Sequence, residues 1–107
     1  ALANLKTTYE NDPSPVVREG ALRSVTLLEP PIPESGALLI EGLRDTDKKV
    51  RAAAAALLRR GFGQHFEYQA DATIGERERA IERWQKWYGK HKNNLKWNKK
   101  ERVFVQT

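Results

Sequence analysis

The sequence predicts an all-α fold in which about two repeated helix pairs are followed by an amphipathic helix and a short β-hairpin. Three observations predict this fold. Residues 45–60 have a high summed helix propensity, a similar pattern occurs 33 positions earlier, and the apolar side chains of residues 76–89 recur at helical spacing. The 107 residues are enough for a single domain, 1–107, with a modest core.

The composition excludes several classes of function. The chain has no Cys, so disulfides, thiol catalysis and cysteine-ligated metal sites are excluded. No apolar run approaches the roughly 20 residues that a membrane span needs. The chain also has no Met and starts at Ala1, which predicts either a leader removed during export to a non-cytosolic compartment or a fragment boundary.

The net charge of +5 is unevenly distributed along the chain. From Glu76 onward there are ten Lys and Arg against four Glu, whereas residues 1–75 carry nine basic against ten acidic residues. The sequence therefore describes a nearly neutral body with a basic C-terminal end.

Residues 1–28 contain the first predicted helix pair. Apolar side chains at helical spacing over residues 2–9 predict a short helix. Ser14 followed by Pro15 is typical of an N-cap and a first helical turn, so a second helix is expected from there to about Leu28. Three prolines in the next five residues predict a loop.

Residues 34–60 contain the second predicted pair. Ser35 is the expected N-cap of a helix over residues 36–43, whose leucines form its buried face. Asp47 is the expected N-cap of the alanine-rich helix that follows, and Gly61 its expected C′ residue. The small alanine side chains allow a neighbouring helix to approach closely.

The two predicted pairs are related by an internal repeat. At an offset of 33 positions the aligned residues are Asp12 and Asp45, Val17 and Val50, Arg18 and Arg51, Ala21 and Ala54, and Val25 and Leu58. A period of this length is typical of proteins built from stacked repeats, although a chance match of five positions remains the alternative.

The Asp, Val-Arg and alanine-rich pattern resembles the second helix of a HEAT repeat. Residues 34–60 look like one nearly complete unit, and residues 1–28 like a degenerate one. The resemblance implies an α-solenoid in which the Asp closes the turn between helices and the Arg supports the next unit. It therefore implies structural roles for four residues: Asp12, Arg18, Asp45 and Arg51. HEAT repeats imply a binding surface and no particular reaction.

The remaining residues change in character. Residues 61–75 form an aromatic connector that we expect to fold back onto the body, and residues 76–89 a capping helix that ends at Gly89. Residues 90–107 are a basic tail whose alternating apolar residues predict a β-hairpin. The W-x-x-W helix and the hairpin are also similar to the closing segment of some bacterial HEAT-repeat proteins.

No catalytic or metal site is predicted. His65 and His91 are far apart and have no partner residues at a recognised metal-ligand spacing. The glycines near residue 61 follow a helix, whereas a phosphate-binding loop leads into one, and no nucleophile motif is present. We therefore expect no enzyme activity, no cofactor and no small-molecule substrate.

Two surfaces are predicted to bind a partner. A stack of only two repeats leaves its end uncovered, so the N-terminal apolar edge is expected to dock on another protein chain or another copy; its residues are Leu2, Leu5, Val16 and Val25. The basic aromatic end is the second surface, made of Lys92, Lys96, Trp97, Lys99, Lys100 and Arg102. Trp84 and Trp87 are expected in the core, whereas Trp97 fits core and surface about equally.

These features predict a non-catalytic protein–protein interaction or assembly subunit on a short HEAT-type scaffold. The likeness to bacterial HEAT-type proteins narrows this expectation to a subunit that organises a larger bacterial redox complex. The alternative is a small nucleic-acid-binding module, because the lysines of the tail are suited to neutralising phosphates. The same tail is equally suited to an acidic protein surface or an anionic membrane. We rank a protein partner first, since the basic residues gather in the tail and no nucleic-acid-binding motif is present.

Overall fold

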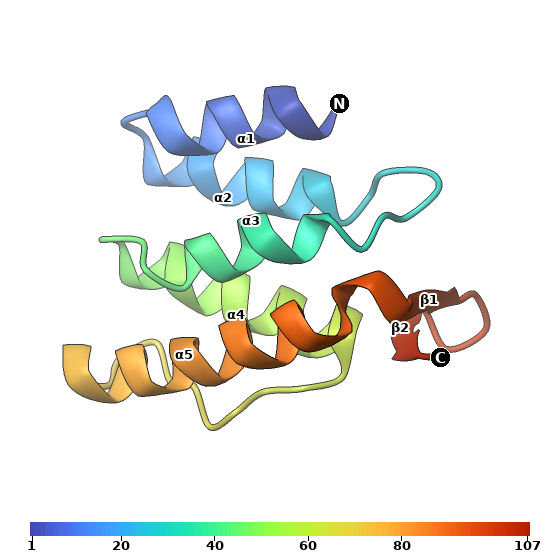
Figure 1. The fold of residues 1–107 in the computed structure, drawn as a ribbon. Coiled ribbons are helices and arrows are strands. Elements are labelled where there is room, and N and C mark those ends of the chain that lie inside the picture. Colours follow the sequence, from blue (N-terminus) through green and yellow to red (C-terminus); the bar gives the residue numbers. More distant parts are fainter.

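A computed structural model describes all 107 residues, and most of them are helical (Figure 1). The elements, in chain order, are α1 (Leu2–Asn11), α2 (Pro15–Val25), α3 (Ser35–Gly42), α4 (Lys48–Phe62), α5 (Ile74–His91), a 3₁₀ turn (Lys92–Asn94), β1 (Leu95–Asn98) and β2 (Val103–Gln106). The two strands pair antiparallel. The predicted predominance of helix and the small hairpin are thereby confirmed.

The helices form two antiparallel pairs, α1 with α2 and α3 with α4 (Figure 1). Helix α2 also packs against α4, and α5 packs against α3. A single cluster of 18 buried residues runs through all five helices and the hairpin. The molecule is thus held together by one continuous core.

Two of the three predicted N-caps are confirmed. The Ser14 hydroxyl accepts a hydrogen bond from a backbone N–H of the first turn of α2, and the Asp47 carboxylate accepts two from the first turn of α4. Ser35, however, is not a cap. It is the first helical residue of α3, it is buried, and Glu34 precedes it without a capping side-chain bond.

Helices α4 and α5 both continue past the glycines at which they were predicted to end. Helix α4 runs to Phe62, and Gly63, with a φ of +73°, occupies the left-handed position that ends it. The buried Phe62 ring explains the extra residue, because its packing outweighs the roughly 1 kcal/mol that Gly61 costs inside a helix. Helix α5 passes through Gly89 and ends at His91.

Small residues set the spacing between the helix pairs. A Cβ atom added to Gly42, at the end of α3, would lie 2.7 Å from Leu22 Cδ1 of α2 and 2.9 Å from Ala54 Cβ of α4. Neither distance is tolerated without movement. The absence of a side chain at Gly42 and the small side chain at Ala54 therefore allow three helices to meet at one point.

The connector and the hairpin cover the remaining side of the core. The Tyr68 hydroxyl donates a 2.6 Å hydrogen bond to the Leu43 carbonyl, so the connector folds back onto the body as its aromatic content predicted. Phe104 of β2 stacks on Phe62 of α4, with 5.0 Å between ring centroids, and pairs across the hairpin with Trp97. The strands are therefore anchored to the helices through aromatic contacts.

Candidate interaction surfaces

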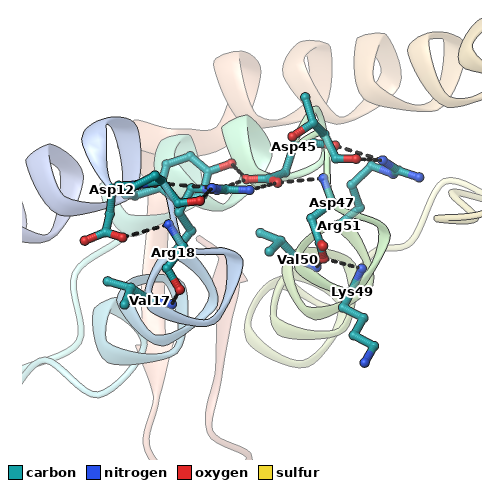
Figure 2. Close-up of polar contacts among 12 residues, drawn as sticks. Asp12, Val17, Arg18, Asp45, Asp47, Lys49, Val50 and Arg51 are labelled. Carbon is teal, nitrogen blue, oxygen red and sulfur yellow. Dashed lines mark hydrogen bonds and ion pairs between the residues drawn. The ribbon is translucent and has the colours of Figure 1, made fainter.

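The carboxylate of Asp45 is the centre of a buried polar cluster (Figure 2). Arg18 binds it in a bidentate manner, with 3.0 Å from Nε to Oδ2 and 2.9 Å from Nη2 to Oδ1. The Tyr9 hydroxyl donates to Oδ2 at 2.8 Å and the Asp47 N–H to Oδ1 at 2.9 Å. Asp45 thus links α1, α2 and the turn before α4.

The hydrogen bonds decide the ionisation of Asp45. Burial by itself would raise the pKa of this carboxyl, but the bonds from Arg18, the Asp47 N–H and Tyr9 outweigh burial, and the pKa lies below its ordinary value. Burial and the neighbouring carboxylate raise the pKa of the Tyr9 hydroxyl, which remains a donor. The cluster therefore holds an ionised carboxylate at neutral pH.

The two arginines of the internal repeat make equivalent contacts. Arg18 Nη1 donates to the carbonyl of Asp12 at 3.2 Å and to the next carbonyl at 3.0 Å. Arg51 Nη1 donates to the carbonyl of Asp45 at 2.9 Å and to the next at 3.1 Å. The carboxylates of Asp12 and Asp45 also each accept from the backbone N–H two residues on. Side-chain geometry is thus repeated together with sequence.

The two arginines donate to different acceptors outside their own turns. Arg18 reaches the carboxylate of Asp45, whereas Arg51 reaches the carbonyl of Ala70 in the connector, at 3.1 Å from Nε and 2.9 Å from Nη2. Arg44 also binds Glu78 of α5 in a bidentate manner. Arg51 therefore joins the second helix pair to the backbone of the connector, and Arg44 joins it to α5 through an exposed ion pair.

The predicted N-terminal apolar edge is only partly an exposed surface. Leu2 and Leu5 are half-buried and pack against the core, whereas Val16 is 80% exposed. Val25 is 1% exposed and belongs to the core, so the expectation that it meets a partner is wrong. It lies on the side of α2 that packs toward the interior, and Val16 lies on the side that faces solvent.

The solvent side of α2 carries a row of exposed residues of mixed character. Val16, Gly20 and Arg23 follow one another at helical spacing along it, and Leu27, which is 72% exposed, continues the row just past the helix end. A Cβ atom added to Gly20 would meet no other atom within 4 Å. We call this row the α2 stripe.

The basic aromatic end lies on the 3₁₀ turn and the hairpin. Its four lysines and Arg102 are exposed and form no ion pair. Trp97 is half-buried, its ring 4.9 Å from that of Phe104, and the Arg102 guanidinium lies 5.9 Å from the centre of the Trp97 ring. One part of the Trp97 side chain thus belongs to the core and the other to this surface.

Neither a protein-family model nor a curated protein sequence matches this chain, and no solved structure matches it.

No three His, Asp or Glu side chains are grouped in a way that would hold a metal ion. The His65 ring accepts a hydrogen bond from the Glu67 N–H, and the His91 ring lies against Trp87. Among the helices, none has both the length and the apolar character needed to cross a membrane.

Three features were missed by the sequence reasoning. Tyr9, read only as an apolar position, supplies a hydroxyl to Asp45. Tyr88 donates to the Pro33 carbonyl at 2.7 Å, and burial raises the pKa of its hydroxyl to about 12. A pocket between α4 and the hairpin also joins residues far apart in sequence. No periodic signal marks such contacts, since each depends on tertiary packing.

Proposed function

We propose that this protein is a non-catalytic interaction or assembly subunit, built on a short HEAT-type scaffold of about two stacked helix pairs. The repeated contacts of Arg18 and Arg51 support the scaffold. Both arginines donate to carbonyls of the turn before their own helix, and both also donate to an acceptor later in the chain. Such a scaffold displays surfaces in fixed relative positions.

The α2 stripe is the observation that carries the proposal. Three of the five large apolar side chains that are exposed lie in residues 16–27, namely Val16, Val17 and Leu27. Val16 and Leu27 belong to the α2 stripe and Val17 is adjacent to Val16 in sequence; exposed apolar groups gathered in one segment are typical of a surface that another chain covers. We infer that the α2 stripe, together with the half-buried Leu2 and Leu5, is the contact with a second protein or a second copy.

Light scattering on a gel-filtration column, over a range of protein concentrations, tests this contact. We expect the mass to rise with concentration, or a partner to be recovered by pull-down, and Val16→Asp to abolish either result. Val16 is a better position than Leu5, because its side chain makes little contact with the core. Ile74→Asp, an equally exposed position on α5, is the matched control. A monomer at every concentration with no recovered partner would exclude the proposal.

We further propose that the complex is a larger bacterial redox assembly, such as the one organised by the tubule-forming subunit of nitrite oxidoreductase. The likeness of the W-x-x-W helix and hairpin to the closing segment of bacterial HEAT-repeat proteins supports this choice. Native mass spectrometry of the protein purified from its source would detect the redox-enzyme subunits. Recovery with unrelated proteins alone would contradict the choice.

A second candidate function is nucleic-acid binding by the basic aromatic end. It is favoured by the four exposed lysines, which have no acidic partner within the chain. Fluorescence anisotropy with labelled duplex and single strand at two salt concentrations separates the two functions. Micromolar, salt-sensitive binding that Lys99→Glu weakens would favour this candidate. Loss of assembly in Val16→Asp with no such binding would favour the first.

A further inference from the structure

A pocket of about 370 Å³ lies between the α2–α3 connection, the C-terminal half of α4 and the β-hairpin. Its walls are mainly apolar and include Val25, Ile32, Leu39, Phe62 and Phe104. The volume is within the range of pockets that hold small ligands or single large side chains. The hairpin thus encloses a space against the helices in addition to covering the core.

Several polar side chains line the pocket and limit the kind of ligand that it could bind. Ser35, which is 4% exposed, contributes a hydroxyl side chain to the lining. Arg60 and Arg102, both exposed, also line the pocket, and neither pairs with a carboxylate. Glu101 is the only acidic residue of the lining. The site therefore combines the Ser35 side chain, apolar walls and a positively charged rim.

The backbone at Arg102 is strained. Its φ of +54° is a left-handed conformation that costs a residue with a Cβ atom about 1 kcal/mol. The conformation is accompanied by the contact of the guanidinium with Trp97, another residue of the lining. Strain of this kind gathers at ligand-binding positions. Glycine or asparagine would relieve the strain but would remove the charge from the rim.

We propose that this pocket binds a partner protein through an acidic segment that inserts one tyrosine side chain. The ring would fill the apolar walls and the phenol hydroxyl would reach Ser35. The carboxylates of flanking acidic residues would face Arg60 and Arg102. This inference rests on the proposed function, since it names the chemistry of a partner for the hairpin end of the scaffold.

Charge complementarity selects an acidic segment, because the rim carries two unpaired guanidinium groups against one carboxylate. A second copy of the chain is a poor source of the tyrosine. Tyr9, Tyr68 and Tyr88 are buried or half-buried, and each already donates its hydroxyl to an acceptor in its own fold. The occupant is therefore a different protein.

Titration of the full chain with the capped peptide acetyl-Gly-Glu-Tyr-Glu-Gly-amide tests the pocket. Backbone amide shifts in ¹H–¹⁵N spectra and the fluorescence of Trp97 report binding. We expect a dissociation constant of about 1 mM or below, typical of a single inserted side chain. Replacing both peptide Glu by Lys, or Tyr by Ala, should weaken binding by about tenfold or more. Phe in place of Tyr should weaken it by about threefold, through Ser35.

Protein variants locate the site. Arg60→Glu combined with Arg102→Glu should weaken binding by about tenfold, whereas Arg59→Glu combined with Lys100→Glu, at exposed positions outside the lining, should change it by less than about twofold. Gly61→Leu tests occupancy by adding a side chain at a lining position. A Cβ atom there meets no other atom within 4 Å, and the substitution favours helix while placing bulk at the lining.

These binding experiments test the pocket independently of the proposed assembly role. No shift of the pocket residues at about 5 mM peptide, equal binding of the Lys peptide, or unchanged binding by Gly61→Leu would overturn the inference. Binding of uncharged aromatic molecules with equal affinity would also overturn it, in favour of a small-ligand site. If the peptide binds but Val16→Asp leaves the molecular mass and partner recovery unchanged, the assembly role fails and the pocket stands.

Discussion

The Tyr9 hydroxyl of α1 donates a 2.8 Å hydrogen bond to Asp45 Oδ2 across 36 positions of sequence. Arg18 of α2 binds the same carboxylate, so the first helix pair is joined to the turn before α4 at one buried point. Because a buried carboxylate is stable only while its partners remain in place, this cluster makes the relative position of the two helix pairs specific.

Asp45→Ala is expected to lower the free energy of unfolding by about 3 kcal/mol, since it leaves Arg18 and the Tyr9 hydroxyl without their acceptor. Asp47→Ala, which removes only an N-cap, should cost about 1 kcal/mol. Urea denaturation followed by circular dichroism measures both. A smaller loss for Asp45→Ala than for Asp47→Ala would contradict the central role of the cluster.

The stability that Asp45 contributes should depend on pH. Its native pKa is lowered, so the native carboxyl binds a proton less readily than the unfolded one. The contribution is therefore complete above the ordinary pKa of about 3.9 and is lost as the pH falls through the lower native value. The pKa of Glu78 is also lowered, by Arg44. For this reason the measurement is the difference in unfolding free energy between the wild type and Asp45→Asn, which should shrink below about pH 4. A constant difference would refute the assignment.

Gly42→Ala should destabilise the protein by about 1 to 3 kcal/mol, because the new methyl group would overlap Leu22 and Ala54. Gly89→Ala is the matched control. It lies inside α5 with open space around it, and should stabilise by about 0.5 to 1 kcal/mol. Thermal unfolding of the two variants should therefore shift in opposite directions. Shifts of the same sign would mean that the helices have room to separate at Gly42.

Arg51→Met should loosen the connector and leave the helices folded. The substitution removes two hydrogen bonds to the Ala70 carbonyl and two to the carbonyls of the turn before α4, while keeping much of the apolar side chain. We expect faster amide hydrogen exchange in residues 64–73 and unchanged exchange in α2, measured by mass spectrometry. Arg59→Met, at an exposed position of the same helix, should leave both regions unchanged.

The elements that the sequence predicted well depend on neighbours along the chain. Ser14 and Asp47 accept from N–H groups within three positions, and the Asp of each repeat accepts from the N–H two residues on. The Arg of each repeat donates to carbonyls of the turn just before its own helix. Local rules of capping and periodicity describe such contacts directly. The same rules placed Trp84 on the buried face of α5.

The errors arose where tertiary packing prevails over local preference. The packing of Phe62 extends α4 past Gly61. Val25 is a different case, because it is the last residue of α2 and shares the buried face with Ala21 and Leu22 at helical spacing. Ser35 has the chemistry of a cap but is buried beside the pocket. Of the candidate sites, the lysines could be placed from sequence because charged tails remain exposed, whereas the pocket could not, since its lining comes from three separate segments.

Arg18 and Arg51 donate to different kinds of acceptor outside their own turns, so one of these contacts is sensitive to acid and the other is not. Protonation of the Asp45 carboxylate weakens its ion pair with Arg18. The Ala70 carbonyl that accepts from Arg51 does not bind a proton in the same pH range. Acid below the lowered pKa of Asp45 should therefore weaken the contact of the first helix pair with the turn before α4, while the bonds of Arg51 to the Ala70 carbonyl persist. Two junctions with matching geometry thus respond differently to the same change of solvent.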